Sequence, residues 1–452
     1  MIISEIFSRF SKNCPMPVAL KATLERVLSP EKLDKWFEVN SDKQYTREIL
    51  FSTLFDLMGM VVFKVFPSVN SAYRSNTESM TASLTSIYNK FNGLEPETTA
   101  ALLRDTSSEM ASLTRGLKAQ RIPLLSGYTV KMLDGNCIEK TEHRLKVLRK
   151  TNAGPLPGKS LVVYDHSLDL AIDLFPCEDG HAQERSLLKK VLPTVKPKDV
   201  WVADRNFCVM GFLSGIELRK GFYVIRRHMN FPLELQGKMQ YVGETETGKV
   251  YEQKIQIKDK DASNKRIVRF ITIELNESTR DSDDVISIIS NLPEDIDAVT
   301  IAEIYRNRWS IETLFQKLTS DLNSEMNTLG YPRAALFGFS LALIAYNALS
   351  IVKAAMRSVH GEEKVEQEVS GYYIAGEVSR TLEGMNVALP DEQWIVFREM
   401  SDREFIRFLK SLMKDVNLLK YKKNTRGVKK TKPKRDQHVG KKHVSTFRLL
   451  TE

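Results

Sequence analysis

The 452-residue sequence predicts an α/β protein: a helical N-terminal domain, a mixed sheet flanked by helices and split by a mostly β insertion, and a helical, basic C-terminal region. Three observations lead to this prediction. Apolar residues recur at helical spacing through residues 1 to about 120. From about residue 128, short β-branched runs alternate with helical segments, as in an α/β sheet. After residue 228, alternating and turn-forming residues replace the helical pattern, which predicts the insertion.

The central elements follow in a clear order. "YTVKMLDGNCI" and "KSLVVYDHSLDLAIDLFPC" predict three strands, the last two joined by a hairpin at "DHSLD". A helix at "HAQERSLLKKVL", a buried strand at "DVWVADRNF", a helix at "CVMGFLSGIELRKG" and a strand at "FYVIRRH" come next. Beyond the insertion, "DVISIISNLPE" predicts a strand and "DIDAVTIAEIYRNRWSIETLFQKL" a single helix.

The chain is longer than the roughly 250 to 300 residues that one hydrophobic core usually serves, so several domains are expected. The predicted divisions are a helical N-terminal domain at 1–120, a core in two parts at 121–228 and 284–360, the β insertion at 229–283, and the C-terminal helical region with its basic tail at 361–452. The resemblance described below implies that the N-terminal domain binds DNA.

Positive charge is concentrated at the C-terminal end. The formal net charge is +9, but residues 420–452 hold 12 Lys/Arg against 2 Asp/Glu, and the first 419 residues hold 54 against 55. A tail of this kind suits contacts with nucleic-acid phosphates, and a solvated terminus is the alternative. The tail residues expected to bind DNA are Lys429, Lys430, Lys432, Lys434 and Arg435.

One uncharged segment, residues 334–352, is long enough to span a bilayer. Tyr346, Asn347 and two serines within it, together with the lack of a second such segment, favour a buried core helix. The four cysteines lie far apart and show no zinc-binding spacing, which is typical of a reducing compartment. We therefore expect a cytoplasmic protein with no membrane partner and no small-molecule substrate.

Three carboxylates are candidate catalytic residues. Asp134 ends the apolar run "VKML", Asp204 ends "VWVA", and Glu312 lies on the predicted helix at 295–318. Taken singly, each has a structural explanation, namely a turn, a helix cap and a helix surface. Together, carboxylates at neighbouring strand ends and on an adjacent helix could hold two Mg²⁺ ions, with Mn²⁺ as a substitute, for phosphoryl transfer.

The same helix carries Tyr305, Arg308 and Trp309 on a sector shared with Glu312, beside a separate apolar stripe. Arg308 could pair with Glu312 or clamp a DNA phosphate, and Trp309 could stack on an exposed base or pack at the edge of the core. Beside Asp204, the side chains of Arg205 and Asn206 could meet DNA or form the turn. His181 and Glu184 could bind a metal ion, but capping of a helix start is the simpler interpretation.

These motifs resemble those of bacterial insertion-sequence DDE transposases, in the group named for its Tyr-Arg-Glu-Lys signature. The resemblance rests on "Y-x2-R-x3-E" at residues 305–312, on "LDGNCI" and "VADRNF" as the two aspartate motifs, and on the basic C-terminal ending. It extends over residues 125 to 450. The signature Lys falls on Thr319, and Lys317 lies on the opposite side of the helix from Glu312.

The resemblance implies an RNase H-like core in which Asp134, Asp204 and Glu312 hold two Mg²⁺ ions and Tyr305 and Arg308 contact DNA. It implies an enzyme that binds terminal inverted repeats, cleaves the element's ends and joins the 3′ hydroxyls to target DNA. The expected partners are double-stranded DNA, as transposon ends and target, and a second copy of the chain, in the bacterial nucleoid. A structure-specific metal nuclease and a catalytically inactive DNA-binding derivative are the alternatives.

Overall fold

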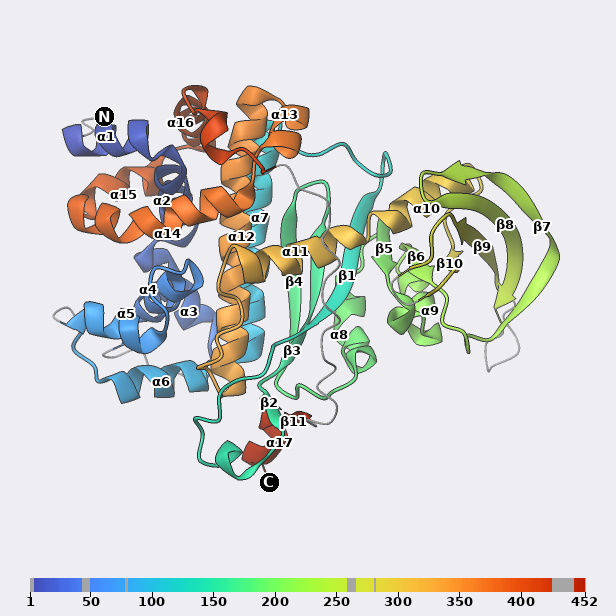
Figure 1. Cartoon of the computed structure of the whole chain (residues 1–452), viewed down its shortest axis with the longest axis horizontal. Helices are drawn as coiled ribbons and strands as arrows, with labels where there is room; N and C mark the ends of the chain where they lie inside the picture. Colours follow the sequence, from blue (N-terminus) through green and yellow to red (C-terminus); the bar gives the residue numbers. More distant parts are fainter. Residues whose placement is uncertain are drawn as a thin grey trace.

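The computed structural model describes residues 4–42, 49–77, 80–257, 266–279, 282–424 and 443–451. It is a mixed α/β structure in which a long sheet is flanked by helices, with most of the helices gathered at one end of the sheet (Figure 1). The mixed sheet flanked by helices agrees with the predicted α/β class.

The N-terminal helices begin at residues suited to that position. The helices are α1 (Glu5–Asn13), α2 (Pro15–Leu28), α3 (Pro30–Asn40), α4 (Phe51–Val62), α5 (Val69–Ser75), α6 (Leu84–Gly93) and α7 (Pro96–Leu117). Proline occupies the first turn of α2, α3 and α7, where its missing N–H costs nothing. Serine side chains at residues 4, 29, 68 and 83 accept backbone N–H bonds at the starts of α1, α3, α5 and α6.

The sheet has nine strands in the order β4-β3-β1-β5-β6-β10-β9-β8-β7. The strands are β1 (Thr129–Cys137), β3 (Lys159–Asp165), β4 (Leu170–Cys177), β5 (Asp199–Ala203), β6 (Phe222–Arg226), β7 (Leu233–Thr245), β8 (Gly248–Ile257), β9 (Arg266–Leu275) and β10 (Val285–Ser290). β1, β5 and β6 are parallel, whereas all the other neighbours are antiparallel. The predicted β3–β4 hairpin is confirmed.

The strands of the predicted β insertion extend this same sheet. β10 pairs with β6 on one side and with β9 on the other, and β8 and β7 follow outward. Because β10 bridges the two parts, the sheet is continuous from β4 to β7, as Figure 1 shows.

Two predicted helices are divided. Residues 181–192 form a 3-10 turn η3 (Glu184–Leu187), a one-turn helix α8 (Leu188–Val191) and a second turn η4 (Leu192–Thr194), where Pro193 cannot continue an α-helix. The helix expected at 295–318 is α10 (Ala298–Arg306) followed by α11 (Trp309–Ser320). The helix predicted near 208–221 is α9 (Met210–Leu218).

Helix α12 (Pro332–His360) is the centre of the helical core. It alone among the described helices is long and apolar enough to cross a membrane, but 94% of its most apolar window is buried within the protein. α12 packs against helices from both ends of the chain, including α2, α4, α7 and the C-terminal helix α16 (Asp402–Lys414). It is a buried core helix, as predicted from its polar residues.

The C-terminal helices join the core that the N-terminal helices form. They are α13 (Glu362–Glu368), α14 (Gly371–Ala388), α15 (Glu392–Glu399) and α16 (Asp402–Lys414), with the short turn η6 (Leu418–Tyr421) after them. At the end of the chain, β11 (His443–Ser445) pairs with β2 (Gly154–Leu156), and α17 (Thr446–Thr451) follows. One hydrophobic cluster runs through residues on both sides of the boundaries predicted at 120 and 361, so those divisions remain predictions.

Candidate active site

Two of the predicted carboxylates lie on neighbouring strands: Asp134 lies within β1, three residues before its end, and Asp204 directly follows β5. β1 and β5 are parallel with Leu133 opposite Ala203, and Asp134 and Asp204 each follow one residue later. The Asp204 side chain caps the 3-10 turn η5 (Arg205–Phe207), because its Oδ1 accepts the Arg205 backbone N–H at 2.6 Å. Because Leu133 and Ala203 are paired, the two aspartates lie side by side where β5 ends.

The third carboxylate, Glu312, lies in the first turn of α11. The expected single helix breaks before it, at residues 307 and 308. The Asn307 side chain donates to the Glu303 carbonyl oxygen at 2.9 Å, and the Arg308 N–H donates to Tyr305 three residues back at 2.9 Å. A side-chain bond to a helix carbonyl and a tighter three-residue turn both interrupt the regular helix.

Arg308 connects the helix to the strand. Its Nη2 lies 2.7 Å from Glu312 Oε1, and its Nη1 lies 3.5 Å from Asp134 Oδ2. The residue is only 8% exposed, and its guanidinium carbon lies 5.8 Å from the Tyr305 ring centroid and 5.5 Å from that of Trp309. Burial alone would lower the pKa of Arg308, but Tyr305 and the three carboxylates raise it. Arg308 is therefore a fixed cation among the acidic residues.

The electrostatics of Asp134 reflect this crowding. Burial raises the pKa of the Asp134 carboxyl to about 7. Arg308 and the Gly135 N–H, which donates to Asp134 Oδ1 at 2.8 Å, oppose that rise, whereas the charges of Glu312 and Glu184 add to it. Asp134 thus lies within the electrostatic reach of two other carboxylates.

The predicted DNA-binding residues differ in their accessibility. Tyr305 is 4% exposed and belongs to the hydrophobic core, so it does not lie on an exposed polar face as expected. Burial raises the pKa of its hydroxyl to about 12, and Asp204 adds to the effect. Trp309 is 49% exposed, because it begins α11 on the outer side of the chain. Its contact with a base therefore stays a prediction.

The remaining predicted DNA contacts fall into two groups. Arg205 and Asn206 form η5 beside Asp204, where the Asn206 carbonyl oxygen accepts from Arg185 Nε at 2.8 Å and the Asn206 residue is exposed. The tail residues Lys429, Lys430, Lys432, Lys434 and Arg435 lie outside the described residues.

Two further acidic residues, Glu184 and Glu325, lie beside β1. The sequence motifs did not indicate that they belong to this site. Glu184 lies so close to Gly135 that a Cβ there would be 2.2 Å from its Oε1. Glu325 accepts from the Asn136 side chain at 3.1 Å and from the Glu139 N–H at 3.2 Å, and burial raises the pKa of its carboxyl. The glycine after Asp134 was the available signal, since it leaves room for a neighbouring side chain.

The carboxylates do not form a metal site in this arrangement. Among the described residues, no three His, Cys, Asp or Glu side chains lie close enough to hold one ion. Carboxylate oxygens are the donors that Mg²⁺ prefers. However, the Arg308 guanidinium lies between Asp134 and Glu312, where a shared cation would lie. The site for two Mg²⁺ ions at Asp134, Asp204 and Glu312 therefore stays a prediction.

Comparison with known families identifies the central part of the chain. Residues 158–348 match the family model described as a transposase DDE domain. The match includes Asp204 and Glu312, whereas Asp134 precedes it by 24 residues. No curated protein sequence matches the chain. The central part of this protein is thus similar to the DDE domain of transposases, which supports a transposase function in general terms.

Proposed function

We propose that the protein is an insertion-sequence transposase that binds terminal inverted repeats, cleaves the element's ends by metal-dependent hydrolysis and joins the 3′ hydroxyls to target DNA. One observation carries the proposal most. Asp134 and Asp204 follow paired positions on two parallel strands, and Arg308 ties Glu312 to the same strand. Three acidic residues from distant parts of the sequence therefore lie near one another, where the interior strand β5 ends.

The strand order supports an RNase H-like core. The five strands β4-β3-β1-β5-β6 combine antiparallel β4, β3 and β1 with parallel β5 and β6. Asp134 lies on β1, the central strand of this set, and Asp204 directly follows its neighbour β5. The family match begins within this region, and the proposal extends it back to β1.

The chain's own residues would act on DNA in distinct ways. Asp134, Asp204 and Glu312 would provide the negative charge of the reaction site, and Arg308 would hold Glu312 in position. Trp309 would stack on a base, while Arg205, Asn206 and the basic tail would contact phosphates. Mg²⁺, if bound by the carboxylates, would activate a hydroxyl for attack at phosphorus. In the structure, the Arg308 guanidinium lies between Asp134 and Glu312, two of the residues that would hold the ion.

The other proposed properties follow from transposition itself. Two DNA ends must be paired before they are joined, so a homodimer in the DNA complex is proposed. The helical residues 1–120 would recognise the terminal repeats, and the protein would act at the bacterial nucleoid. The assignment to the Tyr-Arg-Glu-Lys group rests on residues 305 to 312, with Thr319 at the Lys position.

A catalytically inactive DNA-binding protein is the second candidate. It is favoured by Arg308, whose charge already compensates Asp134 and Glu312, and by the uncharged Thr319. A structure-specific nuclease differs from both in that it cuts DNA without joining it.

One assay separates the three functions. Purified protein is incubated with Mg²⁺, a supercoiled target and a labelled duplex that carries the element's terminal repeat and a free 3′ hydroxyl. A transposase transfers the labelled duplex into joined products. A nuclease only shortens the duplex. An inactive derivative binds the duplex and retards its electrophoretic migration, but neither cuts nor joins it. Loss of joining in Asp204→Ala, with retained DNA retardation, supports the proposal. Unaltered joining in that variant would overturn it.

A further inference from the structure

A second polar region lies on the opposite side of α11 from Glu312. Ser310, Thr313 and Lys317 recur at helical spacing on that side and line a cavity of about 320 Å³. The other walls come from α12, the start of α14 and the β3–β4 hairpin. None of the acidic residues of the candidate active site lines this cavity.

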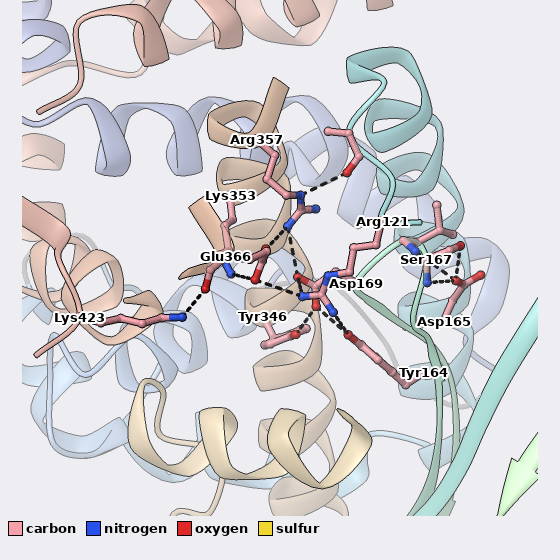
Figure 2. Close-up of polar contacts among 12 residues, drawn as sticks. Arg121, Tyr164, Asp165, Ser167, Asp169, Tyr346, Lys353, Arg357, Glu366 and Lys423 are labelled. Atoms are coloured by element: carbon pink, nitrogen blue, oxygen red, sulfur yellow. Dashed lines mark hydrogen bonds and ion pairs between the residues drawn. The ribbon is translucent and has the colours of Figure 1, made fainter. Parts of the chain in front are cut away.

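Buried ion pairs build its inner wall, as Figure 2 shows. Asp169 is fully buried in the β3–β4 turn, pairs with Arg121 at 2.8 Å, and accepts hydroxyl bonds from Tyr164 and Tyr346 at 2.7 Å each. Despite burial, the surrounding cations hold the pKa of Asp169 well below its usual range. Asp169 is therefore an anion whose hydrogen-bonding capacity is already used.

Glu366 on α13 forms the second fixed anion. Its carboxylate pairs with Lys353 at 2.5 Å and with Arg357 at 3.0 Å, and Arg121 lies 3.8 Å away. The two acidic residues thus hold three cationic side chains in place around the cavity (Figure 2). The cations are positioned by the protein, and no ligand is needed to hold them there.

Positive charge at the wall exceeds negative charge. The cationic side chains that line the cavity are Arg121, Lys317, Lys353 and Lys423, and the acidic ones are Asp169, Asp321 and Glu366. Arg357 lies directly behind them and is almost fully buried. Burial lowers the pKa of the Lys353 ammonium to about 8, against the opposing effect of Glu366. A buried ammonium with a lowered pKa is stabilised by any further anion.

Several donors around the cavity lack a partner. In the described part of the chain, Arg121 Nε and Arg357 Nη2 are buried without a hydrogen-bond acceptor, and no carboxylate lies within 4.0 Å of the Lys317 ammonium. Lys317 Nζ lies 5.6 Å from the Tyr346 ring centroid. In addition, Gly371 at the wall begins the 18-residue helix α14, whose N-cap side chain makes no capping bond. Such a helix end favours an anion, and Asp321 Oδ2 already lies near it, 3.3 Å from where a Cβ on Gly371 would be.

We propose that this cavity binds a phosphate group, presented either by a free phosphomonoester or by the DNA backbone. Phosphate oxygens accept several charge-assisted hydrogen bonds at once, which matches ammonium groups from Lys317 and Lys353 beside an uncapped helix end. The site goes beyond the proposed function, because it uses none of the carboxylates required for DNA cleavage.

Calorimetry on the full chain tests the site. Wild-type protein is titrated with inorganic phosphate and, in a separate experiment, with a short oligonucleotide that lacks terminal phosphates. A titration with chloride at equal ionic strength is the reference. The variant Lys317→Gln removes one of the four cations that line the cavity. The matched control is Lys364→Gln on α13, which makes the same charge change at an exposed position outside the cavity. We expect Lys317→Gln to weaken binding about tenfold or more and Lys364→Gln to leave it unchanged.

The two titrations distinguish the sources of the phosphate. Weakened binding of inorganic phosphate indicates a free phosphomonoester, whereas weakened binding of the oligonucleotide alone indicates a backbone phosphate. Equal behaviour of both variants toward both probes overturns the proposal. A second readout needs no variant: whichever of the two probes binds should slow acetylation of Lys353 at pH 8 in wild-type protein, as measured by mass spectrometry. An acetylation rate that neither probe changes would also overturn the proposal.

Discussion

Arg308 forms an ion pair with Glu312, one turn later in the chain, at 2.7 Å, and the same guanidinium reaches Asp134 on β1 at 3.5 Å. One buried cation thus connects two carboxylates that lie 178 residues apart in the sequence. The break between α10 and α11 lies at Arg308. The turn there lets the Arg308 side chain point toward Asp134 on β1. The Arg308 charge explains why the acidic residues can approach one another without a bound metal ion.

Replacing Arg308 should show whether its positive charge competes with a metal ion for Asp134 and Glu312. In Arg308→Gln, the carboxylates lose their cation, so we expect Mn²⁺ to bind DNA-free protein at least about tenfold more tightly than in wild type. Electron paramagnetic resonance of free Mn²⁺ measures the affinity. Arg306→Gln, which removes a cation that pairs with Glu246 and Glu303, is the matched control. Equal affinities of the two variants would show that Arg308 does not compete with the metal ion.

Asp134 should make stability depend on pH. The pKa of its carboxyl is about 7 in the folded protein, above the usual value of about 3.9 in an unfolded chain. The folded state therefore holds the proton more tightly, and this stabilisation is lost as pH rises toward 7. From pH 5 to pH 8, the unfolding free energy of Asp134→Asn should improve relative to wild type by about 2–3 kcal/mol.

Urea denaturation at the two pH values measures this difference. Asp295→Asn, at an exposed position, is the control and should track wild type. If Asp134→Asn tracks wild type as well, the carboxyl is not buried in the way described.

Trp309 should contribute to DNA binding and little to folding. Half of its side chain is exposed, and base stacking on an aromatic ring contributes about 1–3 kcal/mol. We expect Trp309→Ala to weaken binding of single-stranded DNA by roughly tenfold in fluorescence anisotropy, with an unchanged melting temperature. Tyr372→Ala, at another exposed aromatic residue, should leave the affinity unaltered. Equal losses in both variants would remove Trp309 from the DNA contact.

Adding a positive charge at Thr319 tests whether α11 contacts DNA. The residue is exposed near the end of α11, and its hydroxyl bonds only to the helix carbonyls of Gln316 and Phe315. A cation there should reach a phosphate, so Thr319→Lys should tighten DNA binding and steepen the salt dependence by about one charge. Affinities at several salt concentrations give the slope. Ser411→Lys on α16 should behave as wild type, and an equal gain in that control would show a non-specific charge effect.

The strands and most helices followed from local patterns. The β3–β4 hairpin at "DHSLD" was predictable because Asp165 bonds the N–H groups of the turn and Asp169 adopts a positive φ of 58°. The buried helix α12 was predictable from its polar interruptions. Local pattern alone is enough where a turn or an apolar stripe determines the element.

Burial around Arg308 was not predictable from helical spacing. A wheel diagram places Tyr305, Arg308 and Glu312 on one side, but only the approach of β1 decides that this side is covered. Likewise, alternating residues predicted strands β7 to β9, but the pairing of β10 with both β6 and β9 made them part of one sheet. Such contacts join residues far apart in sequence, so no short stretch of sequence encodes them.

The strand-joining rate of Glu312→Gln tests the central claim most directly. The variant keeps the size of the side chain and can still accept from Arg308, but it removes the negative charge. We predict that single-turnover joining of a pre-cleaved end falls by about a thousandfold or more, with DNA affinity unchanged. Glu303→Gln, on α10, should join at the wild-type rate. A rate for Glu312→Gln equal to that of Glu303→Gln would contradict the account.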